Sequence, residues 1–143
     1  MLAPVDTDEL RVNAQVEAIS SLPEAADAVA VTLLYVFESE EVAETTDVSE
    51  IHAVAMARDR LLADGIAVET ETEQGDPATE ILETADRTDA DLIVLGGRKR
   101  SPLGSFLFGS VSQAVLLETT RPVVITGERE LDRSGADSPA SAE

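Results

Sequence analysis

A short stretch after an apolar run has the residue types that bind a phosphate group. Residues 92–95 read Leu-Ile-Val-Leu, Gly96-Gly97 follows, and residues 98–100 are three consecutive cations. Gly109-Ser110 then opens an amphipathic segment. A buried strand that ends in glycine and leads to a helix N-terminus offers unpaired backbone amides, and small residues let an anion approach them. This stretch is therefore a candidate phosphate site.

Each part of this stretch also has a purely structural explanation. Ser110-Val111-Ser112-Gln113 fits a capping box, in which Ser110 satisfies its own helix rather than a ligand. The cations at 98–100 could neutralise phosphate, pair with carboxylates such as Asp6, Asp8 and Glu9, or face solvent. The residue types leave these alternatives open.

Other side chains with chemical potential are few. Asp6 closes a short first strand and could either line a ligand crevice or cap the helix that follows. His52 is the only histidine and we interpret it as a surface residue at a helix start. With no cysteine, and no paired carboxylates, Ser-His-Asp set or metal-ligand spacing, we expect no catalytic residues and no metal site.

Apolar segments alternate with helical periodicity, which is typical of βαβ units. We expect a solvated loop over residues 38–50, and Asp76 and Pro77 are suited to begin the third helix. The expected strands are residues 2–5, 29–37, 66–72, 92–95 and 122–126, and the expected helices are 8–21, 49–63, one from 77 and one from 110. Right-handed crossovers make this α/β pattern a three-layer α/β/α sandwich with a parallel sheet. Ligands of such sheets bind at the strand C-termini where the strand order reverses.

Composition limits the function classes. The 143 residues suit one domain, residues 1–127, followed by an acidic tail over 128–143 that we expect to be disordered. The net charge is -19 and Lys99 is the only lysine, so we expect the surface of a halophile, and a halophilic archaeon as its source, with an acidic mesophilic protein as the alternative. Such charge disfavours nonspecific nucleic-acid binding. No run approaches the roughly 18 apolar residues of a membrane span and no signal peptide is evident, so we expect a cytoplasmic protein.

Several short motifs occur together in the order and spacing of a known family. They are Pro4-Val5-Asp6, Gly75-Asp76-Pro77, the segment 90–96, the spacing of Gly96 to Gly109-Ser110, and Pro122-Val123-Val124. With these motifs the chain resembles the universal stress protein family over about residues 2 to 127, and the glycine spacing is that of its nucleotide motif, G-x2-G-x9-G-[ST].

This resemblance implies more than the residues show alone. It implies a sheet ordered 3-2-1-4-5, of the Rossmann-like, adenine nucleotide alpha hydrolase-like kind, and a stress-response regulator without a dedicated catalytic role. It also implies a homodimer through the last strand, with Val123, Val124 and Ile125, and a bound adenine nucleotide, ATP or AMP, with the need for Mg²⁺ left open. The implied nucleotide-binding residues are Asp6, Val36, Gly96, Gly97, Arg98, Lys99, Gly109, Ser110, Val111 and Ser112.

Two departures from the family pattern support an alternative. Lys99 stands at the second glycine of the motif, and Asp6 is followed by Thr7, Asp8 and Glu9 where Gly-Ser is common. The alternative is a nucleotide-free dimeric scaffold or chaperone-like stress protein.

Overall fold

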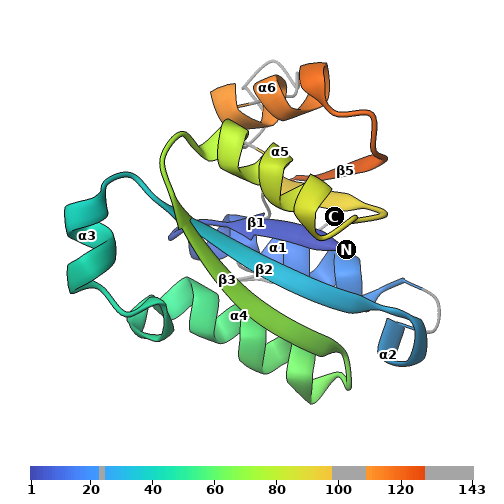
Figure 1. Ribbon diagram of the computed structural model, residues 1–143. Helices are drawn as coiled ribbons and strands as arrows, with labels where there is room; N and C mark the ends of the chain where they lie inside the picture. The colour runs from blue at the N-terminus through green and yellow to red at the C-terminus, as the bar shows by residue number, and fades with distance from the viewer. Residues whose placement is uncertain (23–24, 98–108, 128–143) are drawn as a thin grey trace, which may run out of the picture.

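The computed structural model describes residues 1–22, 25–97 and 109–127, and within them five strands alternate with helices (Figure 1). The strands are β1 (Leu2–Val5), β2 (Ala30–Phe37), β3 (Ala67–Gln74), β4 (Ile93–Gly96) and β5 (Val123–Thr126). The helices are α1 (Glu9–Ser20), α2 (Ala25–Ala28), α3 (Glu40–Thr45), the 3₁₀ helix η1 (Val48–Glu50), α4 (His52–Ala63), α5 (Pro77–Arg87) and α6 (Ser110–Glu118).

The strands form one parallel sheet in the order β3-β2-β1-β4-β5, which confirms the expected fold class. Leu2 is paired with Thr32 of β2 on one side and with Ile93 of β4 on the other, so β1 lies at the centre. From β1 the chain first builds towards β3, and it later returns to the other side of β1 to add β4 and β5. The strand order therefore reverses between β1 and β4.

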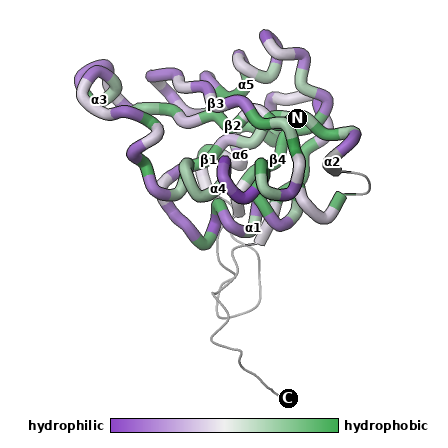
Figure 2. Tube along the Cα trace, turned by 90° about the horizontal axis from the view of Figure 1, so that it is seen from below, coloured by the Kyte–Doolittle hydropathy of each residue, from purple (hydrophilic) through white to green (hydrophobic). Residues whose placement is uncertain are grey.

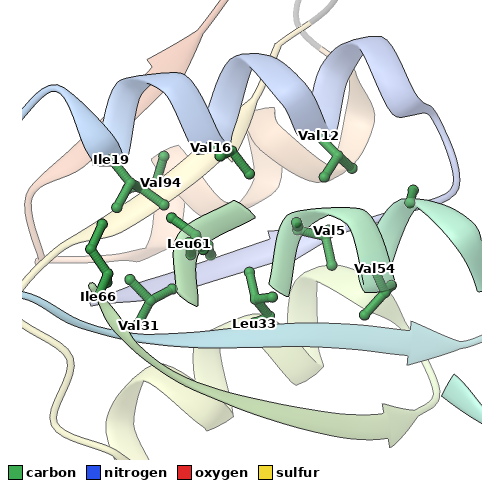
Figure 3. Packing of buried hydrophobic residues seen from close by; sticks show 13 residues of the cluster. Val5, Val12, Val16, Ile19, Val31, Leu33, Val54, Leu61, Ile66 and Val94 are labelled. Atoms are coloured by element: carbon green, nitrogen blue, oxygen red, sulfur yellow. The ribbon is translucent and has the colours of Figure 1, made fainter. Parts of the chain in front are cut away.

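Helices cover both faces of the sheet, and each face has its own apolar cluster. The α1 and α4 side packs Val16, Leu61 and the strand residue Leu33 together (Figure 3). The α5 and α6 side packs around Leu34 and Val115. Because Leu33 and Leu34 are adjacent yet both almost fully buried, β2 is covered on both faces, as a central parallel strand requires. Each such side chain contributes about 1.5–3 kcal/mol by burial.

Local signals for the helix ends agree with the structure at two positions. Asp76 caps α5, where its side chain accepts a hydrogen bond from the Thr79 amide at 3.1 Å, and Pro77 is the first helical residue. After α4, Gly65 has a φ of 81°, and its amide donates to Leu62 O at 2.9 Å. Glycine takes this left-handed conformation without steric cost, which ends the helix.

The prediction of a loop over residues 38–50 is wrong, because α3 and η1 lie within it. The Ser39 side chain accepts a hydrogen bond from the Val42 amide and caps α3, and Asp47 caps η1 through the Ser49 amide. Neither short helix has a buried residue. Capping marks where each begins, and the half-buried Val48 of η1 packs against the α1 and α4 cluster, so the segment has too little apolar periodicity to predict a helix.

Carboxylates occupy the surface. Among the described residues, no aspartate or glutamate is buried. Figure 2 shows hydrophilic stretches along the outer helices and loops and hydrophobic stretches in the sheet. None of the helices in the described part of the chain has the length and apolar character that crossing a membrane would require.

We predict that salt stabilises the fold, because surface repulsion is screened as the Debye length falls from about 10 Å at 0.1 M to about 3 Å at 1 M. Between about 0.1 and 2 M KCl, the thermal midpoint should rise by roughly 10 °C, or about 2–3 kcal/mol. Circular dichroism melts measure it, with sucrose of equal osmolality as the uncharged control. A midpoint that is flat in KCl, or that rises equally in sucrose, would contradict the prediction.

Candidate functional site

A cavity of about 550 Å³ opens at the carboxyl end of β1, the strand that lies between β2 and β4. We call it the crevice cavity. From the β1 and β4 side it is lined by Asp6, Thr7, Arg11, Gly96, Gly109, Ser110, Val111 and Ser112, among others. From the β2 side it is lined by Leu34, Tyr35, Val36, Glu38, Gly75, Pro77 and Ile81, among others.

Most of the described candidate residues lie in this one cavity, although they come from four separate segments. Seven of them line it, namely Asp6, Val36, Gly96, Gly109, Ser110, Val111 and Ser112. Gly97 is buried and is not among the lining residues; its amide donates to Thr126 O at 2.7 Å. Arg98 and Lys99 lie outside the described residues.

The N-terminus of α6 reaches the cavity. Gly109 is the N-cap residue, so the alternative explanation in which Ser110 caps this helix is wrong. Ser110 is instead the first helical residue and is exposed. The next hydroxyl, of buried Ser112, donates to Gly96 O at 3.3 Å and ties the first turn to β4. The first-turn amides lack intrahelical acceptors, and the helix dipole is positive at this end.

Asp6 belongs to an ion-pair network with α1. Its Oδ1 accepts from the Asp8 amide at 2.9 Å, and its Oδ2 accepts from Arg11 Nη1 at 2.5 Å. Asp8 is the N-cap of α1, accepts from the Leu10 and Arg11 amides, and lies 3.5 Å from Arg11 Nη2. Asp8, rather than Asp6, therefore caps the helix, and Asp6 faces the guanidinium in the cavity.

Arg11 also explains why β4 ends in glycine. Its Nε donates to Gly97 O at 3.2 Å, so the side chain extends from α1 to the end of β4. A Cβ at Gly96 would overlap Arg11 Cγ and lie 2.6 Å from Cδ and 3.2 Å from Gln15 Oε1. The absent side chain of Gly96 thus makes room for the stem of Arg11.

The β2 side of the cavity is mainly apolar. Leu34 and Ile81 are buried, and the half-buried Val36 packs with them. Tyr35 stacks edge-on against Phe37, with ring centroids 4.9 Å apart. Burial, followed by the charges of Asp6 and Glu38, raises the pKa of the Tyr35 hydroxyl, so the phenol stays neutral at ordinary pH.

Several cavity residues were not among the sequence candidates. Glu38 and Gly75 directly follow β2 and β3, so the rule that ligands bind at strand C-termini could have indicated them. The position of Arg11 was also informative. A cation in the first turn of a helix is unfavourable because of the helix dipole, so it indicates an interacting group outside the helix. His52 lies on the surface as predicted, with its side chain 77% exposed and Nε2 3.7 Å from Glu9 Oε1. In the described ranges, no three His, Cys, Asp or Glu residues are grouped to hold a metal.

A model of the universal stress protein family matches residues 1–127. The chain belongs to the universal stress protein family. A universal stress protein of Mycolicibacterium smegmatis is 43% identical over 76 residues, which make up 52% of this chain and 56% of that relative. The chain thus spans just over half of this relative's length.

Solved structures share the fold. A universal stress protein from Archaeoglobus fulgidus has a TM-score of 0.72 at 26% identity, covering 87% of this chain and 96% of that one. Another, in complex with dAMP, has a TM-score of 0.67 at 22% identity, with 87% and 94% covered. An Arabidopsis thaliana family protein with AMP bound has a TM-score of 0.64 at 17% identity, with 98% of both chains covered.

For this universal stress protein we predict that Gly96→Ala is destabilising by about 1–3 kcal/mol, because the new methyl group forces Arg11 to move. In an Arg11→Ala background the same change should cost clearly less, since the stem is gone. Urea unfolding of the four proteins measures both effects. Equal costs in the two backgrounds would show that Arg11 is not what requires a glycine here.

Proposed function

We propose that this universal stress protein binds an adenine nucleotide, AMP or ATP, in the crevice cavity and acts as a stress-response regulator without a dedicated catalytic role. The observation that carries the proposal is that a single cavity joins an apolar wall from β2 and α5 to the N-terminus of α6. Related proteins solved with AMP and dAMP share this fold.

In this proposal the base packs against the apolar side. Leu34, Val36 and Ile81 form an apolar surface against which the adenine ring can be buried away from water. The backbone of Val36 and the carboxylate of Asp6 are the polar groups assigned to the adenosine by family resemblance. Both residues line the cavity.

The phosphates are assigned to the α6 side. Amides of Ser110, Val111 and Ser112 belong to the first helical turn, and Gly96 at the end of β4 lines the cavity beside them. Arg98 and Lys99, from outside the described residues, are proposed to add positive charge.

We predict that AMP and ATP bind in calorimetry at about 2 M KCl, and that Ser110→Glu weakens AMP at least tenfold. A glutamate at the first helical position suits the helix dipole, so the fold should tolerate it, while its charge repels phosphate. Gln113→Glu, which adds the same charge at an exposed position of α6 outside the cavity lining, is the matched control and should bind nearly as wild type. No binding at millimolar nucleotide would refute the proposed function.

A nucleotide-free scaffold is the second candidate, and the charges of the cavity favour it. Two carboxylates, of Asp6 and Glu38, line the cavity and would repel a polyphosphate. Native mass spectrometry of protein purified in high salt separates the two functions, because a scaffold would carry no nucleotide mass.

We also propose a homodimer through β5. The two edges of the sheet differ, because β3 carries Glu69, Glu71 and Glu73, whereas β5 exposes Val124. On neighbouring α6, Leu117 is 79% exposed. Charged edge strands resist pairing, and exposed apolar ones favour it.

We predict that Val124→Glu produces monomers in light scattering, because the charge would be buried at the interface. Val42→Glu, at another exposed valine on α3, is the matched control and should remain dimeric. A monomeric wild type, or a Val124→Glu variant of unchanged mass, would refute this interface.

A further inference from the structure

Arg11 joins three parts of the molecule at the crevice cavity. It belongs to the first turn of α1, its Nη1 contacts Asp6 at the end of β1, and its Nε donates to Gly97 O at the end of β4. The guanidinium therefore lies where the two central strands separate, within the cavity lining. No other Arg or Lys among the described residues lines this cavity.

Without Arg11, the charged side chains that line the described part of the cavity would all be carboxylates, which would disfavour binding of an anion. Asp6 and Glu38 both line it, and Asp8 lies 3.5 Å from the same guanidinium. The Arg11 side chain is only 25% exposed and that of Asp6 48%, so solvent screens the pair only in part. Removing the cation would leave the Asp6 carboxylate uncompensated in the same cavity as any bound phosphate.

We propose that Arg11 is a specificity-determining residue, which sets the preference of the cavity for phosphorylated over unphosphorylated adenosine by neutralising Asp6. The inference rests on the proposed nucleotide function and adds a residue that the nucleotide motif does not contain. In this inference the guanidinium acts through its charge. Adenosine carries no phosphate, so its binding depends little on that charge, whereas binding of AMP depends on it strongly.

The test compares the affinities of AMP and adenosine at fixed KCl in calorimetry. We expect Arg11→Met, which keeps most of the stem, to weaken AMP about tenfold and adenosine less than about threefold. Arg11→Lys retains a cation and should keep the ratio of the two affinities near that of wild type. Arg58→Met removes an exposed arginine that pairs with Asp59 outside the cavity lining, and it should change neither affinity.

A double-mutant cycle with Asp6→Asn tests the assigned cause. Asp6→Asn removes the carboxylate nearest to the guanidinium, while Asp8 and Glu38 remain, so Arg11→Met should weaken AMP binding less in this background than in wild type. If Arg11→Met weakens AMP and adenosine equally, or costs as much in the Asp6→Asn background, the inference fails while nucleotide binding stands. If wild type binds neither ligand, the proposed function fails and this inference fails with it. If Arg11→Met does not fold, a lysine variant that loses the AMP preference is sufficient to overturn the inference.

Discussion

The site depends on the handedness of strand connections in a parallel sheet. Right-handed crossovers place α1 and α4 on one face while the chain builds from β1 towards β3. When the chain returns to the other side of β1, the same handedness places α5 and α6 on the opposite face. The segments that leave β1 and β4 must therefore diverge, and no side chain from a single helix can fill the gap between them. The crevice cavity follows from this constraint.

The polar groups of the cavity come from the two segments that follow β1 and β4. The segment after β1 contributes Asp6 and, on α1, Arg11, and these two side chains form an ion pair. The chain after β4 returns at Gly109 and presents the first turn of α6, which Ser112 fastens to Gly96 O. An acidic protein thus places a positive helix end and a guanidinium at one point of its surface. Because Asp6 and Glu38 also line the cavity, this positive charge offsets part of the local acidity in a chain of net charge -19.

The structure follows the sequence pattern most closely where burial or helix capping dictates that pattern. Leu33 and Leu34 could be assigned to a buried strand because consecutive apolar residues satisfy a sheet covered on both faces. Asp76 and Pro77 identified the start of α5 because their preferences are local. The segment containing α3 was misassigned since its helix contacts no core, and Ser110 was misassigned because the cap is set by backbone dihedrals at Gly109.

By itself, the sequence determined the α/β class, the parallel sheet and the glycine spacing that relates this chain to a nucleotide-binding motif, because hydrophobic period and turn chemistry are local properties. Only the tertiary structure decided which polar residues meet. Arg11 and Gly97 are 86 positions apart, yet they share a hydrogen bond because β1 and β4 are neighbours in the sheet. No spacing rule relates such residues, since their proximity comes from strand order. The contact of Arg11 with Gly97, and the reason β4 ends in glycine, could be recognised only once the sheet was assembled.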